Sequence, residues 1–462
     1  MEIRAPLISE VAVPGDALRT LAATRAAEYP VMLDSAAQGP LARFSVLCAA
    51  PQAALWRDSS GVLASSGYTC GSGGFLDNLE TWYRRAAPTV VRGAAGAKKL
   101  LPFCGGWIVY VGYEIAAEVE KSLKLPHAQA PLSAFALRIE HLIVHDLARG
   151  AVFAVSENGD AGAHARLIAD LRAAADQPRE IADEPVPVSH IDEERPELFI
   201  ARVRAAQEHI AAGDIYQANL SRPWHLTLRN ARDAERVYAA LRRANPAPFA
   251  ARAQFRGMTI LSSSPERLLR VSGHEISTRP IAGTRARHGS AEQDRHETAE
   301  LVAHPKERAE HVMLIDLERN DLGRVCEAGS VEVDEYMVTE SYAHVHHIVS
   351  NVRGRLRPDR SPVDALRALF PGGTITGCPK VRCMQIIAEL EGEGRGAYTG
   401  SLGWLGSDGD ADFNILIRTL TLNGADIELR AGAGIVADSI PERELEETRA
   451  KARGLLRAFT TS

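Results

Sequence analysis

Short apolar runs separated by turns constrain the first part of the chain most strongly. Up to about Val155 they recur, for example at residues 30–33, 43–47 and 107–111. Apolar runs this short, bounded by turn residues, are typical of buried strands rather than of helices. We therefore predict a large sheet in this part, followed by a part in which strands alternate with helices.

Two stretches have helical periodicity instead. An alanine-rich helix is expected at about residues 161–175, and an amphipathic helix that begins near Phe199 ends at Gly213, because glycine commonly follows the last turn of a helix. Between these helices, residues 176–196 are acidic and contain prolines. That composition is typical of an exposed linker.

The composition excludes several classes of protein. The 462 residues carry a formal net charge of -6 and contain no basic run, so neither nucleic acid nor an anionic membrane is an expected partner. No apolar stretch reaches the roughly 20 residues that cross a bilayer, and the N-terminus lacks the apolar core of a signal peptide. The six cysteines have no paired zinc-ligand spacing. We expect a cytoplasmic globular protein with reduced thiols.

Two expected helices carry carboxylates three residues apart. Glu307 and Glu310 share a face of the first helix, and Glu444, Glu447 and Lys451 form one stripe on the second. A single pair of this kind is usually a solvated helix face. Two pairs beside apolar sequence would suit Mg²⁺ if the helices face each other, because Mg²⁺ prefers carboxylate oxygens, water and an anionic substrate. Zinc is disfavoured, because the sequence has no H-E-x-x-H motif.

A histidine-rich segment, residues 341–349, is expected to form a strand. Alternation along a strand places His347 on the same face as Val345 and Val349, and His346 on the other. A histidine on an apolar face is commonly a core residue. It is alternatively a site residue, because imidazole titrates near neutral pH, and the pattern leaves both interpretations open.

Two charged residues stand within or just after apolar strands. We predict a strand over residues 413–420, in which Arg418 shares a face with Leu416. An arginine is almost never buried without a partner, so Arg418 forms either a structural ion pair or a clamp on a substrate carboxylate. Glu266 follows the apolar strand at residues 259–261, where catalytic acids often lie, although this motif alone is a weak signal.

Several glycine turns present backbone N–H groups that suit an anion. They are Gly283-Thr284, residues 372–377, and Gly432 with Gly434. Taken singly, each is more often an ordinary turn. The middle turn is a near match to a phosphate-binding P-loop, but Cys378 stands where that loop needs lysine, which argues against ATP binding.

Together, the motifs resemble those of the chorismate-utilising enzymes, the family of anthranilate, aminodeoxychorismate, isochorismate and salicylate synthases. The resemblance covers nearly the whole chain and is densest from about Phe199 to Lys451. Its motifs are GDIYQANLSR (213–222), SPERLL (264–269), TRPIAGTR (278–285), KERAEHVMLIDLERNDLGRV (306–325), HVHHIVSNVRGRL (344–356), GGTITGCPKVRCMQII (372–387), YTGSLGWL (398–405), DFNILIRT (412–419) and GAGIVADSIPERELEET (432–448).

The resemblance implies chorismate as the substrate and Mg²⁺ as the cofactor. Glu310 and Glu447 would hold the ion, with Glu307 and Glu444 in support, and the ion would grip the ring carboxylate of chorismate. The fold implied is α+β, with two large antiparallel sheets packed as a sandwich and helices outside.

The resemblance also implies which residues act on the substrate. Glu266 would be the general acid that helps the C4 hydroxyl leave, and His347 would orient the ring beside Thr374. Tyr398 and Arg418 would hold the enolpyruvyl carboxylate. The residues at the ring-carboxylate end would be Ala282, Gly283, Thr284, Gly432, Gly434 and Lys451.

One position bears on the nucleophile. In family members that add water, a lysine at the position of Gln217 acts as general base. Glutamine cannot deprotonate water, whereas ammonia is already a nucleophile, so the resemblance implies amino transfer. The chain has no glutaminase nucleophile motif, so the ammonia would come from a separate glutaminase subunit or from solution.

The motifs TITGCPKVRCMQII, YTGSLGWL and DFNILIRT are most similar to component I of aminodeoxychorismate synthase, which serves 4-aminobenzoate and folate biosynthesis. Ala282 departs from that type, because many such enzymes have a lysine there, proposed as a covalent nucleophile at C2. Alanine is the anthranilate-type residue, so component I of anthranilate synthase, in tryptophan biosynthesis, is the alternative. A non-catalytic sensor of chorismate or tryptophan is a remote alternative, because the chain has Glu266, the expected general acid, which a sensor does not need.

The resemblance also implies a division of the chain. Residues 1–185 would form the N-terminal region of the synthase component, sharing the two sheets, and residues 196–462 the chorismate-binding catalytic region. The N-terminal region resembles the tryptophan-binding pocket of the family, an interpretation that competes with ordinary strand packing. The residues concerned are Ser35, Arg43, Phe44 and Ser45, and residues 245–249 of the later region, which include Pro246, would close the pocket.

Overall fold

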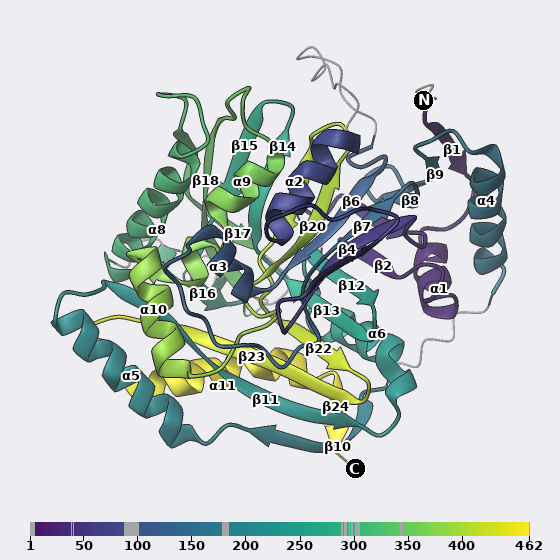
Figure 1. The fold of residues 1–462 in the computed structure, drawn as a ribbon. Coiled ribbons are helices and arrows are strands. Elements are labelled where there is room, and N and C mark those ends of the chain that lie inside the picture. Colours follow the sequence, from purple (N-terminus) through teal and green to yellow (C-terminus); the bar gives the residue numbers. More distant parts are fainter. Residues whose placement is uncertain are drawn as a thin grey trace.

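Two large, mostly antiparallel sheets face each other, with helices on the outside (Figure 1). This computed structural model describes residues 5–86 apart from 38 and 40, 101–177, 184–287, 290, 293–294, 296, 299–300, 305–341 and 345–461. Of residues 232, 284–286, 305–306 and 345 it describes the backbone alone. The architecture confirms the predicted α+β sandwich.

The first sheet has 13 strands within the described residues. In their order across the sheet they are β1 (Leu7–Val11), β9 (Ala151–Ser156), β8 (His141–Asp146), β3 (Phe44–Cys48), β2 (Val31–Asp34), β12 (Phe249–Phe255), β13 (Met258–Ser264), β22 (Thr419–Asn423), β23 (Asp426–Ile435), β11 (Gln217–Leu228), β10 (Val186–Glu193) and β24 (Phe459–Thr461), with β19 (Gly377–Cys378) beside β11. Only β10 and β24 pair in parallel among these.

The second sheet has 11 strands within the same residues. Their order is β16 (Ile281–Ala286), β18 (Val345–Arg355), β15 (Glu275–Arg279), β14 (Arg267–Ser272), β21 (Ala411–Asn414), β20 (Ser401–Gly406), β6 (Gly106–Val111), β7 (Leu132–Ile139), β4 (Ala53–Asp58) and β5 (Leu63–Ser66), with β17 (Glu332–Ser341) beside β18. Each sheet therefore combines strands from the early and the late parts of the chain.

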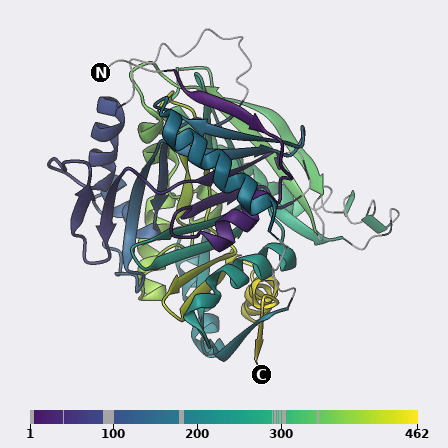
Figure 2. The same cartoon turned by 90° about the vertical axis from the view of Figure 1, so that its right-hand side faces the viewer.

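The helices cover the outer faces of the two sheets. They are α1 (Ala17–Thr24), α2 (Phe75–Ala86), α3 (Ala116–Val119), α4 (Ala161–Ala175), α5 (Pro196–Ala211), α6 (Ala234–Ala244), α8 (Pro305–Gly323), α9 (Pro362–Leu369), α10 (Lys380–Glu391) and α11 (Pro441–Leu456), with 3₁₀ turns η1 (Tyr113–Ile115), η2 (Ala231–Asp233) and η3 (Gly373–Ile375). Figure 2 shows α1 and α4 in front of the strands of the first sheet.

Strand β6 illustrates why the sequence forms a sandwich. Its six residues, GWIVYV, are all buried, as expected for a strand that is covered on both faces. Ile108 and Tyr110 pack between the sheets with Val31 of β2, whereas Trp107 and Val109 pack under α2 on the outer side. Burial on both faces thus fixes β6 in the interior.

The structure confirms most of the predicted elements and corrects one. The predicted strands at 30–33, 43–47 and 107–111 correspond to β2, β3 and β6, and the two predicted helices correspond to α4 and α5. The linker prediction for residues 176–196 is wrong in part, because these residues include β10, which pairs with β11 and β24. Strand β10 lies near the margin of the sheet, where proline and charged residues are tolerated.

The strand predicted over residues 413–420 is also wrong. These residues form the end of β21 and the start of β22, and a crossing segment, residues 415–418, connects the two sheets. Arg418 has a φ of 52°, in the left-handed region that a continuous strand does not accommodate. The crossing is anchored at both ends, since Leu416 N donates to Gly400 O at 2.8 Å and Ser263 N donates to Arg418 O at 3.0 Å.

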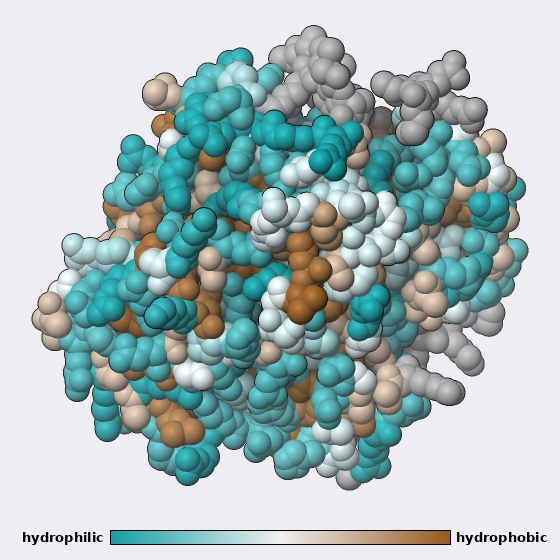
Figure 3. Space-filling view, in the orientation of Figure 1, coloured by the Kyte–Doolittle hydropathy of each residue, from teal (hydrophilic) through white to brown (hydrophobic). Residues whose placement is uncertain are grey.

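On the face seen in Figure 3, hydrophilic residues predominate and the apolar ones form small, separate areas. Among the described helices, none has both the length and the apolar character needed to cross a membrane.

Candidate active site

Glu266 is a buried acid at the junction of the two sheets. It lies between β13 of the first sheet and β14 of the second, and its side chain is only 5% exposed. The backbone is fixed, because Ile415 N donates to Glu266 O at 3.0 Å, and Ile281 N donates to its Oε1 at 3.4 Å. Burial raises the pKa of Glu266 to about 7, against the opposing effects of Thr374, Lys451 and Arg418. A carboxyl of this pKa is suited to general acid catalysis at neutral pH.

The turn η3 presents Thr374 to Glu266. The Thr374 hydroxyl is buried, has no well-aligned hydrogen-bond partner among the described residues, and lies close enough to Glu266 to lower its pKa. Behind this turn lies Glu318 of α8, a buried acid that accepts a hydrogen bond from Gly373 N at 3.2 Å. Burial and the nearby Asp321 raise the pKa of Glu318. Glu318 was not predicted from the sequence, because its burial depends on contacts with the turn η3, which is distant in sequence.

His347 lies on β18, opposite Thr284 of β16. The imidazole Nδ1 faces Gly283 O at 3.4 Å. A carbonyl only accepts, so Nδ1 carries the proton and Nε2 is left as an acceptor. Burial and the nearby Arg418 lower the pKa of His347 to about 4, so the ring is neutral at physiological pH. Gly283 has a φ of 62° at a break in the β16–β18 register, a conformation that favours glycine.

The predicted strand of residues 341–349 is divided in the structure. Ser341 ends β17, and β18 begins at Val345; residues 342–344 lie outside the described ones. Ala282 is half-buried on β16, opposite Ile348, next to the register break at Gly283. The side chain of Thr284 also lies outside the described part, so its predicted role stays a prediction.

Arg418 is a half-buried cation at the crossing between the sheets. No described residue forms a hydrogen bond or ion pair with its guanidinium, and burial lowers its pKa while Glu266 opposes that effect. The sequence left two interpretations of Arg418 open, a structural ion pair and a clamp on a substrate carboxylate. The described residues provide no partner for a structural ion pair. A cation beside the buried Glu266, with no ion-pair partner in the described part of the chain, is suited to binding an anionic substrate group.

Two glycines of β23 make room for polar side chains. A Cβ atom on Gly432 would lie 2.6 Å from the hydroxyl of Tyr398, and a Cβ on Gly434 would lie 2.5 Å from Nε2 of Gln217. The Tyr398 and Gln217 side chains are themselves buried, and Gln217 Oε1 has no hydrogen-bond partner among the described residues. The glycines therefore allow a phenol and an amide to line the same strand.

Lys451 connects helix α11 to this strand. Its Nζ donates to Gly432 O at 2.9 Å and pairs with Glu447 Oε1 at 2.8 Å. It also lies close enough to Glu266 to lower the pKa of that acid. The structure thus brings the chemistry-bearing residues into one neighbourhood, which comprises Gln217, Glu266, Gly283, His347, Thr374, Tyr398, Arg418, Gly432, Gly434 and Lys451.

The four predicted Mg²⁺ carboxylates lie on α8 and α11. Glu307 and Glu310 are half-buried on α8, Glu444 is half-buried and Glu447 is exposed on α11. Among the described residues, no three His, Cys, Asp or Glu side chains gather closely enough to hold a metal by themselves. The donor chemistry nevertheless fits Mg²⁺, which takes one or two carboxylates together with water and a substrate anion. The metal assignment stays a prediction.

The predicted tryptophan pocket corresponds only in part to a cavity. A cavity of about 350 Å³ between the sheets is lined by Ser35, Arg43 and Phe44 together with Pro248 and Phe249. Pro246 is not among its lining residues. Nor is Ser45, whose hydroxyl instead donates to Asp34 Oδ1 at 2.8 Å. None of the ten residues of the candidate active site named above lines this cavity, although Arg267, next to Glu266 in the chain, does.

The fold and the site define a class, enzymes that bind chorismate. The model of the chorismate-binding enzyme family matches residues 56–457. The chain belongs to this family. It is a chorismate-utilising enzyme of the group that includes anthranilate synthase component 1 and aminodeoxychorismate synthase component 1.

Three relatives illustrate the range. The chain is 43% identical over 393 residues to anthranilate synthase component 1 of Streptomyces coelicolor, covering 80% of this chain and 75% of that one. It is 39% identical over 379 residues to aminodeoxychorismate synthase component 1 of Bacillus subtilis, covering 78% of each. The crystal structure of anthranilate synthase component I from Streptococcus pneumoniae superposes with a TM-score of 0.79 at 32% identity, covering 90% of this chain and 93% of that one.

Proposed function

We propose that the protein transfers an amino group from ammonia to chorismate, and that its product is 4-amino-4-deoxychorismate. The observation that carries amination is Gln217, a buried amide; by the family resemblance, the members that add water have a lysine at this position as general base. The observation that favours the C4 product is the similarity of the C-terminal motifs to aminodeoxychorismate synthases. The relative in Bacillus subtilis bears that name.

The leaving group is the C4 hydroxyl of chorismate. Glu266 donates its proton to that hydroxyl, which departs as water. The raised pKa of Glu266 keeps a proton available near pH 7. His347 is neutral, and its Nε2 accepts a hydrogen bond that orients the chorismate ring. The Thr374 hydroxyl of the turn η3 lies beside Glu266.

The two carboxylates of chorismate fix its orientation. Arg418, which has no described counter-ion, binds the enolpyruvyl carboxylate with the Tyr398 hydroxyl. The backbone at Gly283 and Thr284, with Lys451, faces the ring carboxylate. Mg²⁺, held by Glu310 and Glu447 with Glu307 and Glu444 behind them, would neutralise that carboxylate.

Ala282 determines how the nitrogen is introduced. Alanine cannot form a covalent adduct, so ammonia adds at C2 directly while water leaves from C4, and the added nitrogen loses one proton. A second ammonia then adds at C4 and loses one proton, while the C2 amine takes up one proton and leaves as ammonia, so the net reaction consumes one ammonia and releases one water. If the C2-amino compound instead loses pyruvate, the product is anthranilate. Anthranilate synthase is therefore the second candidate function. Ala282, the anthranilate-type residue, and the relatives named anthranilate synthase favour it.

The ammonia source is proposed to be a separate glutaminase subunit, and a lyase would finish 4-aminobenzoate. The cavity at Ser35, Arg43 and Phe44 is proposed to bind tryptophan. An indole in this cavity would face Phe44 and Phe249, and its amino acid head would face polar side chains at the rim.

Ammonium dependence tests the amination. Chorismate and Mg²⁺ are incubated with the protein, with and without ammonium, and chorismate loss is followed by absorbance. Loss that requires ammonium supports the proposal. A Gln217→Lys variant should consume chorismate without ammonium, because lysine can deprotonate water. Wild-type consumption that does not depend on ammonium would contradict amination.

A further inference from the structure

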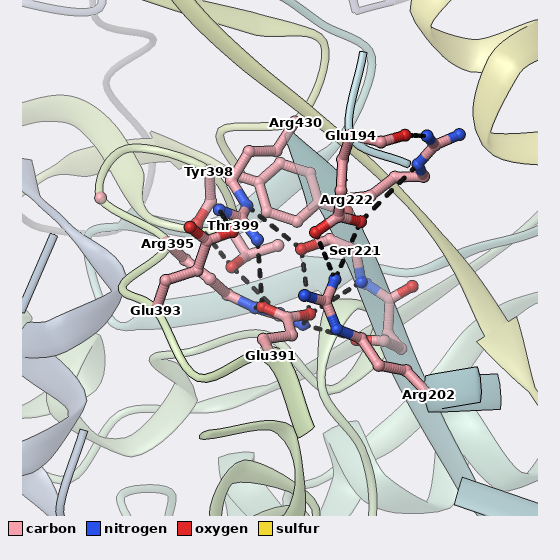
Figure 4. A network of polar contacts seen from close by, with 12 residues as sticks. Glu194, Arg202, Ser221, Arg222, Glu391, Glu393, Arg395, Tyr398, Thr399 and Arg430 are labelled. Carbon is pink, nitrogen blue, oxygen red and sulfur yellow. Dashed lines mark hydrogen bonds and ion pairs between the residues drawn. The ribbon is translucent and has the colours of Figure 1, made fainter. Parts of the chain in front are cut away.

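Arg395 is a fully buried cation that no catalytic step uses. It stands in the loop between α10 and Tyr398, and its side chain is only about 1% exposed. Its Nε and Nη2 donate to the Glu391 carboxylate at 2.9 and 2.6 Å. Figure 4 shows the pair inside a network that also includes Arg430 and Ser221. A buried ion pair needs an explanation, because desolvation can cancel its electrostatic gain.

The remaining donors of Arg395 reach three separate segments. Nη2 donates to Asn219 O at 2.6 Å, and Nη1 faces Ile375 O at 3.3 Å and Thr399 Oγ1 at 3.4 Å. The guanidinium also lies against the Tyr398 ring, 5.6 Å from its centroid, and against the Tyr113 ring on another side. One side chain therefore contacts the first sheet, the turn η3 and the loop after α10.

Each of these segments carries a residue of the candidate site. Asn219 lies two residues after Gln217 on β11, Ile375 follows Thr374, and Thr399 follows Tyr398. The guanidinium therefore connects the loop that carries Tyr398 to β11 and to the turn η3. Arginine suits this role because its planar fork offers five fixed donors, whereas lysine offers a single point charge.

Glu391 holds the other end of the pair in place. Its Oε1 accepts from Ser221 N at 2.7 Å and from Ser221 Oγ at 3.0 Å, on the same strand as Gln217. Burial alone would raise the pKa of Glu391, yet Arg395 and Arg430 hold it below its ordinary value. The carboxylate is therefore ionised, and the pair is a genuine ion pair rather than a neutral hydrogen bond.

We propose that Arg395 is a positioning residue for chorismate. It holds Tyr398 and the Thr374 turn at the distance from β11 that the substrate requires, and it acts through Tyr398 rather than by touching substrate. This inference rests on the proposed function, because it takes Tyr398 as a ligand of the substrate carboxylate. It predicts a defect in substrate binding, where a purely structural ion pair would produce only a loss of stability.

A double-mutant cycle tests the proposal. Chorismate KM and kcat are measured for the wild type, Arg395→Lys, Tyr398→Phe and the double variant. Charged hydrogen bonds of this kind contribute enough that we expect Arg395→Lys to raise KM by about 10- to 100-fold, with kcat changed less than about threefold. In the Tyr398→Phe background the same substitution should raise KM by less than about threefold, because the residue through which Arg395 acts is already impaired.

Arg430→Lys is the matched control. Arg430 is equally buried, belongs to the same network and pairs with Glu391 and Glu393. It forms no hydrogen bond to Thr399 or Ile375 among the described residues. We expect its KM to stay within about threefold of the wild type, with any destabilisation visible in thermal unfolding alone.

The outcomes separate this inference from the function on which it rests. If the wild type does not turn over chorismate, both the proposed function and the positioning role are wrong. The positioning role alone is wrong if the wild type turns over chorismate but folded Arg395→Lys has an unchanged KM. It is also wrong if Arg395→Lys and Arg430→Lys change the KM equally. If Arg395→Lys does not fold, Thr399→Val removes a single contact of Arg395 and should still raise KM about threefold or more; an unchanged KM in that variant also overturns the role.

Discussion

Replacing Glu266 by glutamine should slow the reaction and stabilise the protein at the same time. The substitution keeps the shape of the side chain and an acceptor for Ile281 N, but removes the proton. With a pKa of about 7 instead of 4.5, about half of the Glu266 side chains carry a proton at pH 7. An ordinary carboxyl would do so in roughly one molecule in 300. We expect kcat to fall by about 10²- to 10⁴-fold, the usual contribution of a general acid.

The stabilisation follows from the direction of the pKa shift. The folded protein holds the Glu266 proton more tightly than the unfolded chain does. The free energy of unfolding therefore falls as pH rises from about 4.5 to about 7, and it stays lower by the full amount above that range. Each pH unit corresponds to about 1.4 kcal/mol, so the cost at pH 8.5 is about 3 kcal/mol. For a chain of this length, about 3 kcal/mol corresponds to a Tm shift of about 3 °C.

Thermal unfolding at two pH values measures this effect. Glu266→Gln should melt about 3 °C above the wild type at pH 8.5 and within about 1 °C of it at pH 5. Wild-type kcat/KM should decline above about pH 7, as the free enzyme loses the proton. A variant that is no more stable at pH 8.5 than at pH 5, or that retains kcat while KM rises, would refute the assignment of Glu266 as a buried general acid.

Four further substitutions test other parts of the site. Glu310→Gln or Glu447→Gln should abolish turnover, because the Mg²⁺ proposed to bind there would no longer neutralise the ring carboxylate, while Tm stays unchanged or rises, because a charge is removed from a cluster of carboxylates; near wild-type activity at saturating Mg²⁺ would exclude these ligands. Gly434→Ala should raise the KM for ammonium about tenfold or more without unfolding the protein, because its Cβ would displace the flexible Gln217 amide; an unchanged KM would remove Gln217 from the ammonia site. Ala282→Lys should give a covalent chorismate adduct by intact mass and shift the product toward the C4 amine; no adduct would mean that this side chain does not face C2.

The sequence predicted the architecture well wherever burial alone determined it. Strand β6 is apolar on both faces, and α4 and α5 have regular helical periodicity, so their local patterns and their tertiary positions agree. Strand β10 was missed because a strand at the margin of a sheet tolerates the proline and acidic residues that also mark linkers.

The site was predicted mainly through the family motifs. Periodicity alone placed Arg418 on a strand, but the left-handed backbone at that residue depends on contacts with Ser263 and Gly400 that are distant in sequence. The raised pKa of Glu266 likewise comes from burial between two sheets, which no local pattern reports. Glu318 and Arg395 were missed for the same reason, because a buried acid or arginine is recognised only from its three-dimensional partners.

Product identification tests the central proposal most directly. Purified protein is incubated with chorismate, ammonium and Mg²⁺, without any lyase, and the product is analysed by mass and ultraviolet absorbance. The account predicts 4-amino-4-deoxychorismate, which gives 4-aminobenzoate once a lyase is added. Accumulation of anthranilate without a lyase would contradict it and assign the protein to anthranilate synthesis.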